Sequence, residues 1–263
     1  MTTPPHGTAA GDDLQFDDPG ALAAVVADAP RPLLIGLDID GVLAPIVAHA
    51  DDSELLDGVA AAVGRLANRP DVTVAAVSGR SLASIRSFGL PDGLELVGGH
   101  GMERSDRPTR PLDDEEAARL TELRRLADDA AAAAGDGAWV EQKSASVVLH
   151  VRQADRERGS RAIATLDEQC AAIEGAEQKH GSEVLELFAR SASKGAAMAT
   201  LGTEAGAATS VFVGDDVTDE EAFAALADFD IAIKVGSAAT IAGHRLRDPA
   251  AVLAWLRALG DAL

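Results

Sequence analysis

The chain has 263 residues, 47% of them hydrophobic, and a formal net charge of −20. The length suits one large domain or two of ordinary size, and the apolar content supports a substantial core. The negative charge disfavours nucleic acid and anionic membrane surfaces as partners. A phosphorylated substrate would need a site that is locally positive or holds a metal ion. We expect a small-molecule ligand and a monomeric protein.

The N-terminal residues are polar and rich in proline and glycine. They lack a basic start and a hydrophobic signal core, so we interpret residues 1–20 as a flexible tail of a cytoplasmic protein. No apolar run is long enough to span a membrane, so we expect no membrane partner. The single cysteine, Cys170, excludes an intrachain disulfide and lies in a helical pattern, where we expect it to be a packing residue.

Residues 21–104 alternate between predicted helices and strands. Apolar runs indicate buried strands, and apolar residues spaced three and four apart indicate helices. The predicted strands are 33–38, 72–77 and 94–97, and the predicted helices are 19–30, 53–67 (with Ser53 as N-cap) and 81–88. This alternation is typical of a parallel, doubly wound sheet.

Between residues 105 and 189 the alternation gives way to helix and hairpin units. The predicted elements are a helix over 113–134, a hairpin of 139–143 and 146–152, a helix over 154–173, and strands near 177–179 and 183–188. Such units indicate a small α+β domain with an antiparallel sheet.

The alternation returns in residues 190–263. The predicted elements are helices over 194–201, 219–226 and 249–259 and strands over 210–213 and 229–235. We therefore expect an α/β fold: a Rossmann-like core of three layers, built from residues 21–104 and 190–263 around a parallel sheet. An α+β cap domain, residues 105–189, would be inserted into it.

The first apolar run of the core ends in two acids, Asp38 and Asp40. A buried strand has no structural use for two carboxylates at its exit, whereas ligands bind at the carboxyl ends of parallel strands. Further polar residues at comparable places are Ser78, Lys194, Asp215, Asp216 and Asp219. Three of them also have a structural explanation: Ser78 as a helix cap, Lys194 as a solvated side chain and Asp219 as a first-turn acid. The pair Asp215 and Asp216 is harder to explain in this way, because it directly follows the apolar strand SVFVG.

Together these residues suit magnesium-assisted phosphoryl transfer. Mg²⁺ prefers oxygen ligands, and Asp38 and Asp215, on separate strands, could meet at one ion. Lys194 would add positive charge and Ser78 a hydroxyl donor to phosphate, which stabilise the charge of the transition state. An ionised carboxylate can attack phosphorus to form an aspartyl-phosphate, and a neighbouring acid can protonate the leaving oxygen.

Four segments, DIDGVL, SGR, Lys194 and GDDVTDEEAF, resemble in order the motifs of the haloacid dehalogenase superfamily of phosphatases. The resemblance implies that Asp38 is the nucleophile and Asp40 the general acid/base. It implies a phosphate site of Ser78, Gly79, Arg80 and Lys194. It also implies a Mg²⁺ site of Asp38, Asp215, the main-chain carbonyl of Asp40, and Asp219 or Asp216. The long interval between Ser78 and Lys194 would hold the cap.

The resemblance extends to the trehalose-6-phosphate phosphatases, through LDIDGVLAPIVAHADDS, GGHGME, VEQKSASVVLHVR and GSEVLEL. In that family cap residues grip the sugar, which implies a sugar-binding set of His100, Glu141, Lys143, Arg152 and Glu186. The sequence departs from the family pattern at Ile39, where an aromatic residue is usual, and at Val42, where Thr is common. FARSASKG also replaces a more usual Arg-Pro pair before the lysine.

We thus expect a Mg²⁺-dependent enzyme of trehalose biosynthesis that hydrolyses trehalose 6-phosphate to trehalose and phosphate. One alternative is the same chemistry on another sugar phosphate, such as sucrose phosphate, a glycosyl-glycerate phosphate or a hexose phosphate, including phosphomutase activity. Another is a catalytically inactive sugar-phosphate sensor. Phosphate release from a panel of sugar phosphates distinguishes all three.

Overall fold

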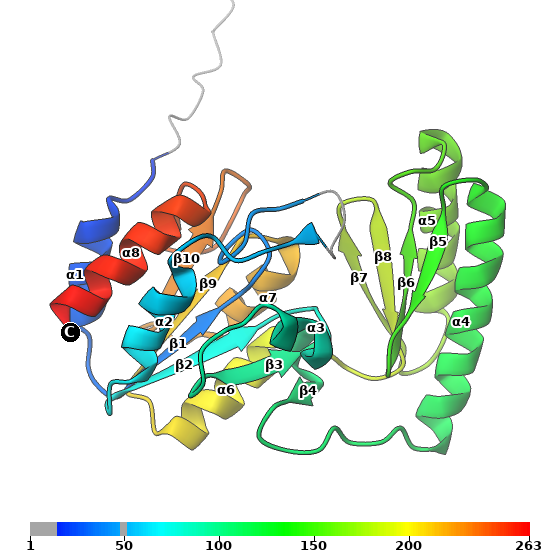
Figure 1. The fold of residues 1–263 in the computed structure, drawn as a ribbon. Coiled ribbons are helices and arrows are strands. Elements are labelled where there is room, and N and C mark those ends of the chain that lie inside the picture. The colour runs from blue at the N-terminus through cyan, green and yellow to red at the C-terminus, as the bar shows by residue number, and fades with distance from the viewer. Residues whose placement is uncertain (1–14, 48–51) are drawn as a thin grey trace, which may run out of the picture.

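The computed structural model of the chain describes residues 15–47 and 52–263. Within these residues the strands form a seven-stranded and a four-stranded sheet. Figure 1 shows the two sheets in two units side by side, with the chain crossing between them twice. Most of the predicted N-terminal tail, residues 1–14, lies outside the described residues, and the first helix, α1, already begins at Pro19.

The large sheet has the order β11-β10-β9-β1-β2-β3-β4. Its strands are parallel except for β4, which runs antiparallel to β3. The strands are β1 (Leu33–Leu37), β2 (Val72–Val77), β3 (Glu95–Gly98), β4 (Glu103–Arg104), β9 (Thr209–Gly214), β10 (Ile231–Val235) and β11 (His244–Leu246). Every residue of the central strand β1 is buried, which explains its uninterrupted apolar sequence.

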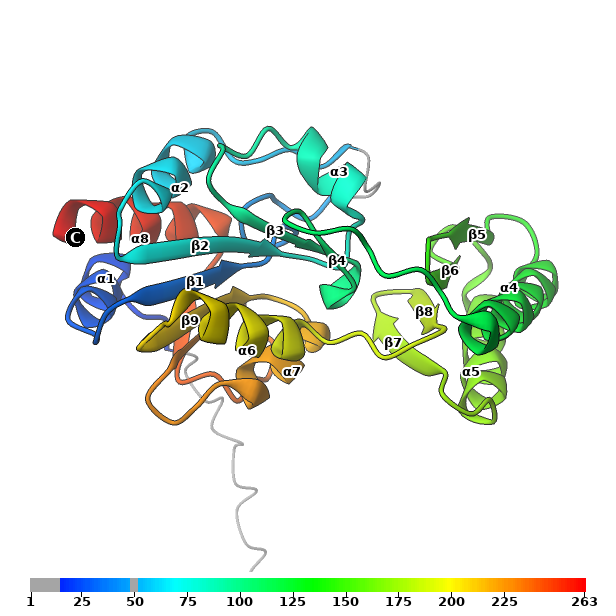
Figure 2. The same cartoon turned by 90° about the horizontal axis from the view of Figure 1, so that it is seen from below.

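Helices cover both faces of this sheet, which gives three layers (Figure 2). Leu33, Ile35 and Leu37 of β1 pack with α1, α2 and α8, whereas Leu34 packs on the other face with α6 and α7. The helices are α1 (Pro19–Ala27), α2 (Val59–Ala67), α3 (Leu82–Ser87), α6 (Lys194–Ala205), α7 (Val217–Ala225) and α8 (Pro249–Ala262), with a short helical turn at Gly99–Gly101. The expected three-layer α/β core is therefore confirmed.

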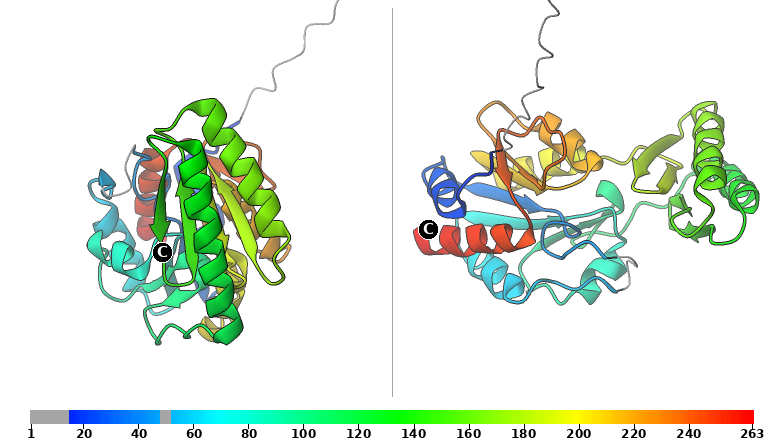
Figure 3. Two further views of the ribbon diagram at one scale, coloured as in Figure 1. Left: turned by 90° about the vertical axis from the view of Figure 1, so that its right-hand side faces the viewer. Right: turned by 90° about the horizontal axis from the view of Figure 1, so that it is seen from above.

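The insertion contains an antiparallel sheet with the order β5-β6-β8-β7. Its elements are α4 (Asp114–Ala134), β5 (Trp139–Gln142), β6 (Ser146–His150), α5 (Arg156–Ala171), β7 (Glu177–Gly181) and β8 (Val184–Phe188). Both helices lie on the same face of the sheet, as Figure 3 shows from the outer side. Apolar strand residues such as Leu149 and Leu187 pack against them, together with the buried Cys170. The prediction that Cys170 is a packing residue is confirmed.

Some predicted boundaries are wrong. Helix α2 begins at Val59, after Gly58 in the left-handed conformation, so Ser53 is not its N-cap. Strand β10 begins at Ile231, and Phe229 before it is 71% exposed. Strands β4 and β11 were not predicted, because two or three residues show no periodicity. Among the described helices, none combines the length and apolar character needed to cross a membrane.

Candidate active site

The strand register brings the predicted motifs to one edge of the large sheet. Leu37 at the end of β1 lies opposite Val213 on β9, so Asp38 and Asp215 leave neighbouring strands at nearly the same level. Ser78 directly follows β2, the other neighbour of β1. Lys194 is the first residue of α6. The carboxyl ends of parallel strands thus collect these side chains, as expected for a ligand site.

Three carboxylates gather around one ammonium group at this edge. Oxygen atoms of Asp38, Asp215 and Asp219 lie within 4.8 Å of one another. Lys194 Nζ donates a hydrogen bond of 2.7 Å to Asp38 Oδ2 and another of 2.7 Å to Asp219 Oδ1. Asp38, Asp219 and Lys194 are buried. Carboxylate oxygens in excess over the local positive charge are a donor set that fits a hard divalent cation.

Burial shifts the titration of this cluster. Burial raises the pKa of Asp38 to about 7, although Lys194 opposes the shift. Burial, with the nearby charges of Asp38 and Asp219, raises the pKa of Asp215 to about 8. Burial alone would lower the pKa of Lys194, but Asp219 and Asp38 hold it above its ordinary value. The ammonium of Lys194 therefore stays charged, whereas Asp38 and Asp215 resist ionisation near neutral pH unless a further cation neutralises them.

Two glycines permit the close packing of the site. Gly41 has a φ of 72°, and a Cβ there would lie 2.1 Å from Asp215 Oδ2. A Cβ at Gly79 would lie 2.4 Å from His100 Nε2. Any other residue at Gly41 would be strained and would also displace Asp215.

The side chain of Asp40 lies in a separate ion pair. Arg80 donates to both of its oxygens, with Nε 2.6 Å from Oδ2 and Nη2 2.7 Å from Oδ1. Ser53 Oγ adds a hydrogen bond of 3.1 Å to Oδ1. Ser78 does not cap the next helix; Ser81 does, and Ser78 Oγ accepts a hydrogen bond from the backbone N–H of Arg80. Arg80 therefore orients the second carboxylate of the DIDG segment.

Asp216 and Asp219 have different positions. Asp219 Oδ2 accepts hydrogen bonds from the backbone N–H groups of Asp215 (2.8 Å) and Asp216 (3.0 Å), while its Oδ1 faces Lys194. Asp216 is the N-cap of α7 and accepts from Val217 N. Among the residues that the structure describes, the cluster of three carboxylates thus includes Asp219 but not the side chains of Asp216 and Asp40. Asp219 is also a first-turn acid of α7, so both explanations of it hold.

Lys234 is a contributor that the sequence analysis missed. It is buried, and its Nζ donates to the carbonyl of Asp216 (3.3 Å) and to Glu220 Oε1 (3.1 Å). These bonds tie the loop that carries Asp215 to strand β10. The signal in the sequence is a lysine within the apolar strand IAIKV, because a lysine in a buried strand needs a partner.

A second polar cluster joins the insertion to the core. Glu186 on β8 accepts from Ser146 Oγ (2.6 Å) and from Lys143 Nζ (3.0 Å), and lies 3.5 Å from His100 Nε2. Lys143 Nζ also donates to the carbonyl of Gly79, 3.3 Å away. His100, on the core, is buried with Nδ1 lacking a partner among the described residues. The cluster thus lies next to the SGR segment.

The pKa values of Glu186 and His100 in this second cluster are both lowered, for different reasons. Although burial opposes it, the hydrogen bond with His100 and the charge of Lys143 lower the pKa of Glu186 to about 2. Burial lowers the pKa of His100, with Glu186 only partly offsetting it. At neutral pH we therefore expect an ionised Glu186 beside a neutral imidazole.

The remaining predicted sugar residues lie farther from the core. Glu141 Oε2 is 3.1 Å from His150 Nε2, on the neighbouring strand. Arg152 follows β6 at the end away from Ser146, where its Nη2 donates to the carbonyl of Ser182 over 3.4 Å. The structure thus brings His100, Lys143 and Glu186 together, whereas Glu141 pairs with His150 and Arg152 lies beyond the end of β6.

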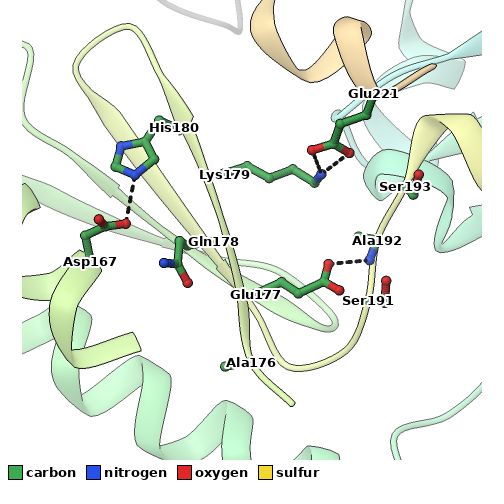
Figure 4. Close-up of a pocket in the computed structure, with 10 residues that line it drawn as sticks. All are labelled: Asp167, Ala176, Glu177, Gln178, Lys179, His180, Ser191, Ala192, Ser193 and Glu221. Carbon is green, nitrogen blue, oxygen red and sulfur yellow. Dashed lines mark hydrogen bonds and ion pairs between the residues drawn. The ribbon is translucent and has the colours of Figure 1, made fainter. Parts of the chain in front are cut away.

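A separate hollow of about 630 Å³ lies on β7 beside the chain segment that returns to the core (Figure 4). Its charged groups are paired: Lys179 Nζ with Glu221 (2.6 Å to Oε1) and His180 Nε2 with Asp167 (2.7 Å). None of the carboxylates of the acidic cluster lines it. We interpret it as a contact region between β7 and α7, and not as the catalytic site.

Comparison with known proteins agrees with this arrangement. The family model Trehalose-phosphatase matches residues 36–249. The chain is 33% identical over 235 residues to trehalose-6-phosphate phosphatase of Escherichia coli, covering 86% of each protein. It is also 33% identical over 266 residues to trehalose-phosphate phosphatase of Mycobacterium tuberculosis, covering 92% of this chain and 66% of that protein.

Solved structures share the fold. A trehalose-6-phosphate phosphatase related protein superposes with a TM-score of 0.69 at 26% identity, covering 87% of this chain and 97% of the other. A haloacid dehalogenase-like hydrolase from B. subtilis has a TM-score of 0.58 at 16% identity, covering 82% and 95%.

The parallel core, with an acidic cluster at the carboxyl ends of its strands and an α+β unit inserted into it, has the fold of the haloacid dehalogenase-like proteins. The family model that matches residues 36–249 and the 33% identity to the E. coli enzyme identify one family within this fold class. The chain belongs to the trehalose-phosphatase family.

Proposed function

We propose that the protein hydrolyses trehalose 6-phosphate to trehalose and inorganic phosphate. The observation that carries the proposal is the group of Asp38, Asp215 and Asp219 around Lys194, in which only Asp215 is partly exposed, in a chain of the trehalose-phosphatase family. The direct test is phosphate release from a panel of sugar phosphates. We expect a clear preference for trehalose 6-phosphate over sucrose 6-phosphate and glucose 6-phosphate; equal rates would contradict the assigned substrate.

We propose that the reaction has two steps and that Asp38 is the nucleophile. An oxygen of Asp38 forms a bond to phosphorus while the bond from phosphorus to the sugar oxygen breaks, and Asp40 gives that oxygen a proton. Asp40 then takes a proton from water, and the water oxygen attacks phosphorus to release phosphate and restore Asp38. Because Arg80 holds Asp40 in this structure, proton transfer requires Asp40 to turn from Arg80 toward the leaving oxygen.

Positive charge at the site comes from Lys194 and, we propose, from Mg²⁺. Asp38, Asp215, Asp219 and the main-chain carbonyl of Asp40 would hold the ion, with Asp216 outside them. Bound Mg²⁺ would supply charge neutralisation for the phosphate group. Ser78, Gly79 and Arg80 would hold the remaining phosphate oxygens, next to the end of β1.

Mg²⁺ binding predicts a pH-dependent stabilisation. Because the pKa values of Asp38 and Asp215 are raised to about 7 and about 8, ionising them costs stability, so metal-free protein should lose stability as the pH rises through these values. Mg²⁺ binds the ionised forms, and it should raise Tm more at about pH 8.5 than at about pH 6. Differential scanning calorimetry with Mg²⁺ or EDTA measures the shift.

The variant Asp215→Asn, which removes one of the proposed ligands, should lose most of the Mg²⁺-induced shift. The matched control is Asp71→Asn, which should keep the Mg²⁺-induced shift. Asp71 directly precedes β2 and lies at the amino ends of the parallel strands, away from the acidic cluster. An equal shift at both pH values would show that the ion does not bind the buried carboxylates.

We propose that residues 105–189 act as a cap whose polar sheet face reads the sugar, with residues 21–104 and 190–263 as the catalytic core. The support is that Lys143 and Glu186 reach Gly79 and His100 of the core. Glu141 and Arg152 would bind sugar hydroxyls farther out on the same unit. Charge-assisted hydrogen bonds suit a polyhydroxyl ligand.

Glu186→Gln should separate sugar recognition from chemistry. We expect kcat/KM for trehalose 6-phosphate to fall roughly 10- to 100-fold, the contribution of one charge-assisted hydrogen bond. Hydrolysis of p-nitrophenyl phosphate, which has no sugar, should change little. Glu168→Gln, on the exposed side of α5, is the matched control. An equal loss with both substrates would show that Glu186 does not read the sugar.

The alternatives make different predictions in the same assays. A phosphomutase would exclude water and release little phosphate, and a sensor would release none from any ester while still binding a sugar phosphate. The monomeric state and the cytoplasmic location stay predictions; analytical ultracentrifugation tests the first.

A further inference from the structure

Trp139 is an exposed aromatic residue in a polar setting. It begins β5, and 51% of it is exposed. The neighbouring Val140 packs with α4 and α5, so Trp139 and Glu141 lie together on the opposite face of the strand. That is the sheet face of Glu186, which lies opposite Val148, the partner of Glu141. An indole on this face leaves apolar surface in water, at a cost in free energy.

Two neighbours fix the orientation of the indole. Trp139 lies opposite His150 in the register of β5 and β6. The two rings stack in parallel, with centroids 3.9 Å apart and planes 2° apart. His150 Nε2 is in turn 3.1 Å from Glu141 Oε2. The carboxylate of Glu141 holds the imidazole and the imidazole covers one face of the indole, while about half of Trp139 stays exposed to solvent.

The position of Trp139 relative to the core is set by β5. Lys143, which follows β5, reaches the carbonyl of Gly79 in the core. Trp139 is four residues earlier, or about 13 Å along an extended strand, with Glu141 midway. Along β5, from the catalytic edge outward, this sheet face therefore offers charged groups first and an aromatic face last. That order suits a ligand with its phosphate at the core and a sugar ring at the far end.

We propose that Trp139 is a stacking platform for the sugar ring farther from the phosphate; this rests on the proposed function. The C–H bonds on one face of a pyranose carry partial positive charge and pack on the electron-rich face of an indole. The ring hydroxyls point outward from this contact, where Glu141 accepts their hydrogen bonds. Trp139 thus favours a disaccharide phosphate over a monosaccharide phosphate, which is too short to reach it.

Steady-state kinetics of three variants test the proposal. Trp139→Ala should raise KM for trehalose 6-phosphate about tenfold while kcat stays within about twofold, and KM for p-nitrophenyl phosphate should not change. Trp139→Phe should restore most of the affinity, because a phenyl ring still offers a face. Phe229→Ala is the matched control. Phe229 is also exposed, but it precedes β10 and so lies at the amino ends of the parallel strands, away from the catalytic site.

Fluorescence gives a second readout. The chain has two tryptophans, and the other, Trp255, is fully buried in the core. Titration with trehalose should therefore change the emission of the wild type through Trp139 alone, and Trp139→Phe should abolish the change. A structural role of the stack with His150 would instead lower Tm and reduce turnover of both substrates.

The outcomes separate this proposal from the proposed function. If the wild type hydrolyses trehalose 6-phosphate but Trp139→Ala keeps its KM, or loses both activities equally, the platform is wrong and the function stands. If the wild type releases no phosphate from trehalose 6-phosphate, the function is wrong. The platform is then also wrong unless trehalose, sucrose or maltose still changes the emission of Trp139.

Discussion

Replacing Asp38 by asparagine is expected to abolish turnover of every phosphate ester. Asparagine keeps the shape of the side chain and removes the oxygen that we propose attacks phosphorus, so kcat should fall by at least about 10⁴-fold for trehalose 6-phosphate and for p-nitrophenyl phosphate alike. The fold should persist, because burial raises the pKa of Asp38 to about 7 and a neutral amide removes that cost. Phosphate release and thermal melting measure both effects.

Asp71→Asn is the control for this variant, since it changes an aspartate of the core at the other edge of the sheet. Incubation of the wild type with substrate and rapid acid quenching should trap phosphate on the protein, and Asp38→Asn should trap none. Turnover of the variant near the wild-type rate would show that another group attacks phosphorus.

Lys194→Met is expected to have the second large effect, on stability as well as activity. Lys194 is 2% exposed and bonds to both Asp38 and Asp219. Its removal leaves two buried carboxylates without their cation, which costs about 3–5 kcal/mol of unfolding free energy. Turnover should be lost as well, because the phosphate loses its buried positive charge. Urea denaturation and phosphate release measure the two losses.

The double variant Asp38→Asn with Lys194→Met serves as the control for stability. Because this double variant removes one of the two buried carboxylates that have lost their cation, it should recover part of the lost unfolding free energy but none of the activity. The loss in Lys194→Met should also be smaller at acidic pH, where the carboxylates are protonated. A Lys194→Met protein as stable as the wild type would refute the buried ion pair.

The sequence predicted which helices and strands form the fold better than it predicted where they begin and end. A buried parallel strand such as β1 can be recognised in the sequence, because both of its faces are covered and its residues are continuously apolar. The start of α2 was wrong, because Ser53 has the chemistry of an N-cap but its hydroxyl bonds to Asp40, across a loop. A cap residue competes for partners that only tertiary structure supplies.

Similarly, the site could be predicted where chain position alone determines it. Asp38 and Asp215 follow neighbouring strands, so the motifs predicted their meeting. The pair of Asp40 with Arg80 and the link from Lys234 to the Asp216 carbonyl depend on side chains meeting across elements. No spacing in the sequence encodes these contacts. The same holds for the stack of Trp139 on His150, which needs the register of β5 and β6.

The central place of β1 has a consequence for the order of folding. β1 lies between β2, which follows it closely in sequence, and β9, which begins only at Thr209. The strands of the insertion, in contrast, come from one continuous stretch, and loop closure between near neighbours costs less entropy. We expect the insertion to form early and the catalytic edge to be completed last, after synthesis has passed β9. A nascent chain released before that point would present the formed antiparallel sheet of the insertion but would lack Asp215 and Asp219 of the acidic cluster.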